Sequence, residues 1–167
     1  GHARRARVKN LIAPLHYSDE TVGVPEAFVR QIGQALQNLE GKQNVMVKLI
    51  GFTDDLPLTG RAEMIYGTPL ALSKARAHRV ALAIQDALDL PTAAVASDGR
   101  GAAQPLASNE TARGRALNRR VEVEFWHDDP LQSLPDEPQL CPEAAAAEVV
   151  TKVYEPAWGT LDALEVE

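Results

Sequence analysis

The chain is poor in cysteine and in aromatic residues, and it has no long apolar run. Its single cysteine, Cys141, excludes an intrachain disulfide. The residues before it, Pro-Gln-Leu, are unlike the small residues that precede the cysteine of a lipoprotein cleavage site. No apolar stretch approaches the roughly 20 residues that a membrane-spanning helix needs. A signal peptide is also missing, but we interpret Gly1-His2 as a cloning scar, so this absence says nothing of the parent protein.

Residue types that support metal-dependent or covalent catalysis are few and unsuitably spaced. The four histidines, none of which has the spacing of a metal site, are His2, His16, His78 and His127. Ser73 and His78 are five residues apart, which puts them on different faces of a helix, so they do not form a nucleophile and its base. Asp54 and Asp55 are adjacent and point apart, which makes them a poor acid and base pair. We therefore expect no enzyme, no metal site and no cofactor.

Charge divides the chain into unlike parts. Residues 1–127 carry 16 Lys and Arg against 13 Asp and Glu, whereas residues 128–167 carry 1 against 10. Four prolines between Asp128 and Pro142 make residues 128–167 an acidic, proline-rich tail, or the start of a following region. Residues 3–9 are basic without interleaved aromatics, so we interpret residues 1–9 as the scar and a solvated linker and expect no nucleic-acid binding. One domain, residues 10–127, remains.

Hydrophobic periodicity predicts an α+β fold. A helix that begins at Pro25 and stops at Gly41 has one apolar face, made of Phe28, Ile32, Leu36 and Leu39. A second helix begins at Pro69, with Thr68 as its N-cap, and ends near Leu90; its apolar stripe is Leu70, Ala77, Val80, Ala81, Ile84 and Leu88, with Arg76 at the rim. Strands are predicted over residues 10–17, 45–50, 94–96 and 119–126, and alternation in the last of them puts Val121, Val123 and Phe125 on one face. The order β-α-β-α-β-β predicts a two-layer sandwich with helices on one face of a small mixed sheet.

Three motifs carry a family resemblance. Residues 51–54 read GFTD, residues 72–80 read LSKARAHRV and residues 114–125 read GRALNRRVEVEF. Between the last two lie the matching residues Gly99, Gly101, Pro105, Asn109 and Thr111. In this order and spacing the motifs resemble the OmpA-like peptidoglycan-binding domain, the group that includes the C-terminal domain of OmpA, MotB and Pal. The resemblance covers residues 8–127.

This resemblance implies a ligand and the residues that bind it. The family's ligand is the diaminopimelate side chain of the peptidoglycan stem peptide, whose end carries an ammonium beside a carboxylate. By resemblance, Asp54 accepts the ammonium and Arg76 clamps the carboxylate, as an arginine fork suits a planar anion. Arg119 lines the same pocket, and Thr53 and Phe52 belong to the first motif. The implied function is a non-catalytic module that tethers a larger protein to the wall. Its place is the periplasm or cell envelope of a Gram-negative bacterium, associated with the outer membrane, and it meets a membrane only through the parent protein.

The sequence departs from the family pattern in three places. Phe52 stands where the family usually has His, and Pro69 replaces an Asn three residues before Leu72. Residues 55–67 make the interval before Arg76 several residues longer than usual, with enough apolar side chains to fold back beside the pocket. These departures leave open an alternative function, a protein–protein interaction domain on the same fold with a degraded pocket.

Structural roles also remain open for single residues. Asp54 on its own suits a turn-capping carboxylate, and Arg119 suits an ion pair within its own domain. We expect Asn109 to cap a turn or a helix and Gly114 to meet a backbone requirement.

Overall fold

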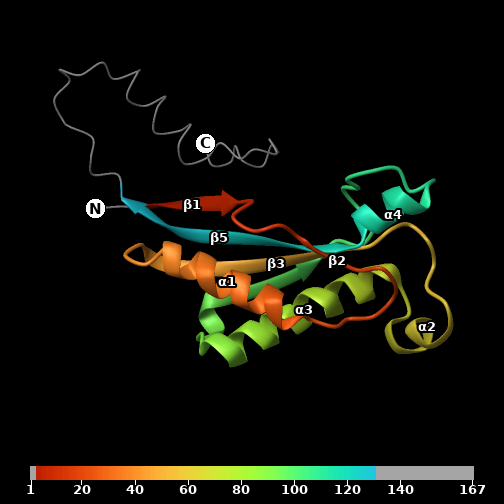
Figure 1. The fold of residues 1–167 in the computed structure, drawn as a ribbon, viewed down its shortest axis with the longest axis horizontal. Coiled ribbons are helices and arrows are strands. Elements are labelled where there is room, and N and C mark those ends of the chain that lie inside the picture. The colour runs from red at the N-terminus through yellow and green to blue at the C-terminus, as the bar shows by residue number, and fades with distance from the viewer. Residues whose placement is uncertain (1–2, 131–167) are drawn as a thin grey trace, which may run out of the picture.

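A mixed sheet and two helices packed on one of its faces make up the two layers of the molecule (Figure 1). The computed structural model describes residues 3–130. Its strands are β1 (Ala3–Lys9), β2 (Leu15–His16), β3 (Gln43–Phe52), β4 (Val95–Gly99) and β5 (Arg120–Pro130). Its helices are α1 (Glu26–Asn38), α2 (Gly60–Tyr66), α3 (Pro69–Leu88) and α4 (Ala112–Asn118), with a 3-10 turn over Thr92–Ala94. The predicted α+β fold class is confirmed.

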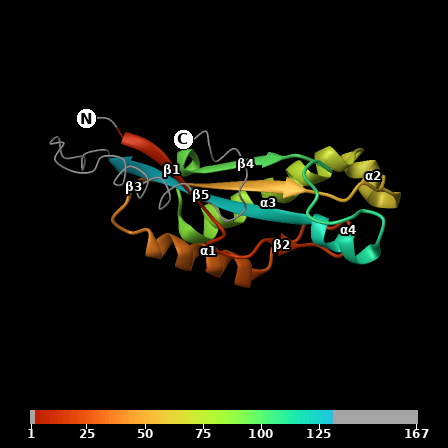
Figure 2. The same cartoon turned by 90° about the horizontal axis from the view of Figure 1, so that it is seen from above.

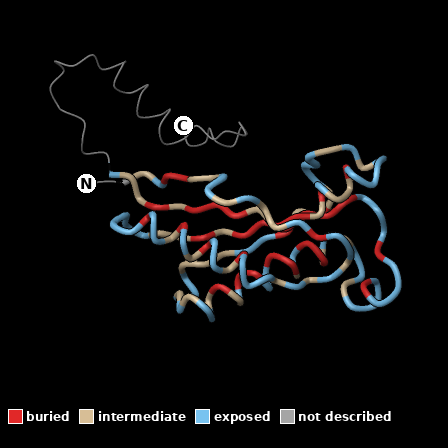
Figure 3. The backbone as a smooth tube through the Cα atoms, in the orientation of Figure 1, coloured by how far each residue is buried: buried red, intermediate tan, exposed pale blue. Residues whose placement is uncertain are grey.

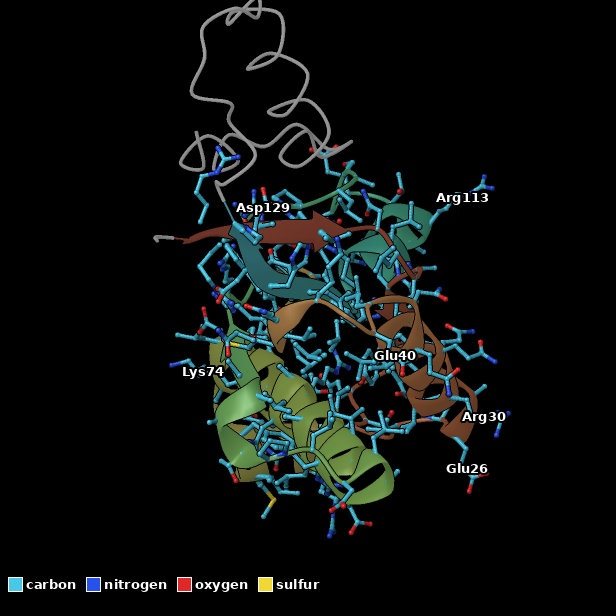
Figure 4. The ribbon with its side chains drawn as sticks, turned by 90° about the vertical axis from the view of Figure 1, so that its left-hand side faces the viewer. Glu26, Arg30, Glu40, Lys74, Arg113 and Asp129 are labelled. Atoms are coloured by element: carbon cyan, nitrogen blue, oxygen red, sulfur yellow. The ribbon has the colours of Figure 1, made fainter. Side chains whose placement is uncertain are left out.

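The sheet has the order β1-β5-β3-β4, and β2 pairs with β5. β3 and β4 are parallel, with Val47 opposite Val95, and α3 lies in the crossover between them. β5 runs antiparallel to β3, with Leu49 opposite Val123. Seen along the strands, α1 and α3 lie side by side beneath the sheet, and the labelled Glu26 and Arg30 of α1 point outward (Figure 4). Figure 2 shows α2 and α4 beyond the strand ends at one end of the molecule.

The core lies between the sheet and the two large helices, where the buried stretches of strand and helix face one another (Figure 3). Strand alternation sends the odd-numbered residues of β5 into this core, as predicted. The fully buried apolar side chains of this core include Ile32, Val47, Leu49, Ala77, Val80, Ile84, Val121 and Phe125. Burying a side chain of this kind stabilises the fold by about 1.5–3 kcal/mol.

α3 begins where the sequence predicts and ends at Leu88, two residues before the predicted end. The Thr68 hydroxyl accepts a hydrogen bond from the Ala71 N–H at 3.1 Å, and Pro69 occupies the first turn. Its buried stripe is nevertheless shifted from the predicted one, because Leu70 is 45% exposed and Leu72 is buried. Leu72 packs against the segment between β3 and α3, which the periodicity of the helix alone does not reveal.

That segment, residues 55–67, contains the short helix α2. Leu58 and Ala62 are buried against Leu72, so the prediction that the segment folds back on the domain is confirmed. We name residues 55–67 the α2 insertion. Its outer side remains open to solvent, since Met64 is 86% exposed.

The N-terminal prediction was wrong. The first strand is Ala3–Lys9 and not residues 10–17, and only Leu15–His16 of that range is a strand. β1 pairs with β5, and Arg5 bonds Asp128 at 2.9 Å, which lowers the pKa of that carboxyl. Cationic residues alternate with Ala6 and Val8 along β1, and such alternation is typical of a strand. Our interpretation of residues 1–9 as a solvated linker overlooked this pattern.

The division of the chain into a domain and a tail stays a prediction. The predicted tail begins at Asp128, but β5 continues to Pro130. Residues 131–167, which hold the rest of the predicted tail, lie outside the described residues.

Close packing of α3 on β3 predicts a large effect of one methyl group. A Cβ at Gly51 would lie 2.1 Å from the backbone oxygen of Ser73, so Gly51→Ala forces the helix away from the strand. We expect the free energy of unfolding in urea to fall by about 1–3 kcal/mol. Gly23→Ala is the control, because a Cβ at Gly23 meets nothing within 4 Å. Equal stability of the two variants would contradict this packing.

Candidate functional site

The predicted site residues meet at the end of the sheet where β3 ends and β5 begins. Asp54 follows β3, Arg76 lies in α3 and Arg119 directly precedes β5. Because β5 is antiparallel to β3, its first residues lie beside the last residues of β3. Asp54, Arg76 and Arg119 line a cavity of about 220 Å³, which we name the first cavity. Its lining consists of Asp19, Glu20, Thr53, Asp54, Leu56, Pro57, Leu58, Thr59, Leu72, Arg76 and Arg119.

Arg76 is buried completely, deeper than the predicted rim position. Its Nε donates to the Thr21 carbonyl at 2.9 Å, and its Nη2 donates to the Asp19 carbonyl. The guanidinium lies 4.2 Å from the centroid of the Tyr17 ring, a cation–π contact. Burial lowers the pKa of Arg76 to about 10, so the side chain stays charged at neutral pH.

One nitrogen of this guanidinium has no hydrogen-bond partner among the described residues. Nη1 of Arg76 is shielded from solvent and makes no hydrogen bond with the residues that the structure describes. A buried charged donor left in this state costs free energy, which a carboxylate at the same place would recover. Arg76 is thus a fixed cation with one unused donor at the wall of the first cavity.

Asp54 provides the opposite charge in the same cavity. Its Oδ2 accepts from Arg119 Nη1 at 2.7 Å, and its Oδ1 accepts from the Leu56 N–H at 3.1 Å. Arg119 also donates through Nε to the Tyr17 carbonyl at 2.7 Å. Both structural alternatives for these residues are therefore present, the turn cap and the ion pair, and both residues also line the cavity. An ionised carboxylate has about four acceptor positions, so Asp54 keeps capacity for another donor.

The structure separates the two remaining predicted residues. Thr53 lines the first cavity, and its buried Oγ1 has no hydrogen-bond partner among residues 3–130. Phe52 is not part of the lining, and its buried ring lies 3.9 Å from the Arg120 guanidinium. Phe52 is the last residue of β3, whereas Thr53 follows the strand and leads to Asp54.

Arg120, the second arginine of the third motif, has a structural role. It donates to Glu122 at 2.7 Å and to the carbonyls of Asn118 and Gln104, both at 3.1 Å. Burial lowers its pKa, and Glu122 opposes that effect. These bonds join the start of β5 to the loop before α4.

The start of the third motif and the matching residues just before it build the turn around α4. Thr111 caps α4 by accepting from the Gly114 N–H at 2.9 Å, and the Asn109 side chain accepts from Asn118 Nδ2 at 2.8 Å. A Cβ at Gly114 would lie 1.8 Å from the Ser108 carbonyl, so the position needs glycine. Gly114 therefore meets a backbone requirement, as expected, but the cap of α4 is Thr111 and not Asn109, whose side chain bonds that of Asn118 instead.

Several residues of the site were not predicted. Tyr17 carries the ring against Arg76, and its burial raises the pKa of the phenol to about 12. Asp19 and Thr21 contribute backbone carbonyls, which leave no trace in the side-chain sequence. For Tyr17 alone the sequence held a hint of a role in the site, because this residue ends a predicted strand and precedes a polar turn.

Comparisons with known proteins agree with this arrangement. The sequence profile of the OmpA family matches residues 25–119. The chain belongs to the OmpA family. As an OmpA-like domain it is similar to the cell wall anchor of the T6SS from Pseudomonas aeruginosa, with 26% identity and a TM-score of 0.56 over 74% of this chain and 80% of that one.

Two further structures share the fold of this OmpA family member. The C-terminal domain of Helicobacter pylori MotB is 19% identical with a TM-score of 0.56, over 84% of this chain and 96% of that one. The peptidoglycan-associated lipoprotein of Burkholderia pseudomallei is 22% identical with a TM-score of 0.54, over 68% and 90%. In sequence, the probable lipoprotein YiaD of Escherichia coli is 41% identical over 78 residues, which are 46% of this chain and 32% of that protein. The chain thus spans about a third of that curated relative.

Within the described part of this OmpA-like domain, no group of three or more His, Cys, Asp and Glu is placed to hold a metal ion. Nor does any helix of residues 3–130 have the length and apolar character needed to span a bilayer.

The contact between Tyr17 and Arg76 predicts an asymmetry between two substitutions. The Tyr17 hydroxyl has no hydrogen-bond partner among the described residues, so Tyr17→Phe leaves the free energy of unfolding unchanged or raises it. Tyr17→Leu removes the ring from the buried cation and lowers that free energy by about 1–3 kcal/mol. Thermal and urea denaturation of both variants measure the difference. If Tyr17→Phe were as destabilising as Tyr17→Leu, the hydroxyl and not the ring would hold this site together.

Proposed function

We propose that this OmpA-like domain is a non-catalytic peptidoglycan-binding module that grips the diaminopimelate of the stem peptide. The observation that carries the proposal is the unused donor of buried Arg76 in the same small cavity as Asp54. A cation and an anion held in one cavity match a ligand that presents both charges on a single carbon atom. The free end of a diaminopimelate side chain has this chemistry.

Each charge of the ligand has a named partner in the proposal. The ligand carboxylate takes the Nη1 donor of Arg76, and the ligand ammonium donates to Asp54. Thr53 adds a hydroxyl that has no other partner among the described residues. Arg119 holds Asp54 in place and repels the ammonium, which keeps the grip reversible. Because Nη1 is shielded from solvent, binding also requires a small shift of the cavity wall.

The cellular role follows from the family and from what its members are called. Similar proteins are a cell wall anchor, a peptidoglycan-associated lipoprotein and a probable lipoprotein. We infer that the chain tethers a larger cell-envelope protein to the wall in the periplasm of a Gram-negative bacterium, in association with the outer membrane. Contact with a membrane then comes only through the parent protein.

The exposed side of the α2 insertion favours the alternative, a protein–protein interaction domain. Met64 and Ile65 are 86% and 56% exposed there, as in a surface that meets a partner. This alternative gives no role to the unpartnered donor of Arg76, which is why wall binding is the preferred function.

Binding to two wall types tests the proposal. We expect the chain to sediment with peptidoglycan that contains diaminopimelate and not with peptidoglycan that contains lysine at that position, because lysine lacks the second carboxylate. Asp54→Asn weakens binding by about 2–5 kcal/mol, the usual loss when one member of a buried charge pair is removed. Arg76→Lys keeps the charge but weakens binding because an ammonium cannot reproduce the donor geometry of the guanidinium. Arg79→Lys is the control, because Arg79 lies exposed on the same helix.

The outcome that would contradict the proposal is equal sedimentation with both wall types by the unmodified chain and by both site variants. Urea denaturation of Arg76→Lys shows whether the fold is intact, since this side chain also holds the carbonyls of Asp19 and Thr21.

A further inference from the structure

A second cavity, of about 410 Å³, lies directly beside the first. Its walls come from α2, through Arg61, Ile65 and Tyr66, and from the segment after β2, through Asp19, Glu20 and Thr21. Asp19 and Glu20 also line the first cavity, so the two cavities share one wall. Figure 1 shows α2 at the end of the molecule, beyond the start of α3.

Internal hydrogen bonds already occupy the acidic side chains of that wall. Asp19 accepts from the Thr21 hydroxyl at 2.7 Å and from the Thr21 N–H at 3.0 Å, which lowers the pKa of its carboxyl. Glu20 accepts from the Thr59 N–H at 3.2 Å and so joins the wall to the start of α2. These hydrogen bonds hold the shared wall in place, and an anionic ligand beside it needs a cation to offset the charge of the carboxylates.

Arg61 is a cation of this cavity without a polar partner among the described residues. Its side chain is exposed and has no hydrogen bond or ion pair with the residues that the structure describes. It lies in the first turn of α2, where the helix dipole does not favour a cation. The half-buried Tyr66 and the exposed Ile65 supply apolar surface beside it. The combination suits a ligand with an extended body and one carboxylate.

We propose that the second cavity binds the main chain of the same stem peptide, with Arg61 paired to the α-carboxylate of the glutamate that precedes diaminopimelate. The inference rests on the proposed function, because a diaminopimelate side chain in the first cavity brings its own main chain to the shared wall. The glutamate is joined through its γ-carboxyl, so its α-carboxylate is free and one residue away from diaminopimelate. The α2 insertion thus extends the site from one amino acid to a peptide.

Calorimetry with two probes tests the inference on the full chain. The probes are free meso-diaminopimelate and the tripeptide L-Ala-γ-D-Glu-meso-diaminopimelate. We expect Arg61→Gln to weaken tripeptide binding about three- to tenfold, as for a partly exposed charge-assisted pair, and to leave diaminopimelate binding unchanged. Arg113→Gln on α4 is the control, because Arg113 is an exposed arginine that points away from the domain (Figure 4).

A second form of the tripeptide identifies the partner of Arg61. Amidating the glutamate α-carboxylate should weaken binding to the unmodified chain and abolish the difference between that chain and Arg61→Gln. Equal tripeptide affinity of the two chains would overturn the inference, as would an equal loss for both probes, which would show damage to the first cavity. Failure of the unmodified chain to bind free diaminopimelate would instead overturn the proposed function.

Discussion

The buried guanidinium of Arg76 is the interaction on which the site depends. It joins the helix layer to the segment between β2 and α1 through the carbonyls of Asp19 and Thr21 and the ring of Tyr17. Removing a charge from water costs several kcal/mol, and a buried ion is stable only when hydrogen bonds replace the lost water. In Arg76, Nη1 has no hydrogen bond with the described residues to replace its lost water, and Arg76 lines the first cavity. The incompleteness is what makes this residue a candidate for ligand binding.

Small residues beneath α3 position that charge. Gly51 and Gly99 let the backbone of α3 approach β3 and β4 more closely than any side chain would permit. Ser73 continues this contact by accepting a hydrogen bond from the Gly101 N–H at 3.0 Å. Arg76, one turn further along the helix, is held against the sheet end by the same close approach. Core packing and site geometry are therefore two consequences of one helix position.

The sequence predicted the parts of the fold that depend on local patterns. The caps of α3 and the alternation of β5 are local, so Thr68 and Val121 were placed correctly. The burial of Arg76 depends on a segment far away in the sequence, and periodicity alone put it at the rim. The three motifs brought together Asp54 and Arg76, whereas the contribution of Tyr17 was missed because an aromatic residue at a strand end is most often only core.

Amide and guanidinium shifts of the labelled chain during titration with meso-diaminopimelate test the central claim most directly. The account predicts saturable shifts confined to Thr53, Asp54 and the Nε–H of Arg76, together with neighbours in the first cavity. Lysine, which lacks the second carboxylate, should leave the Arg76 signal in place. Absence of shifts at these positions, or an equal response to lysine, would contradict the assignment of Arg76 as the clamp for the ligand carboxylate.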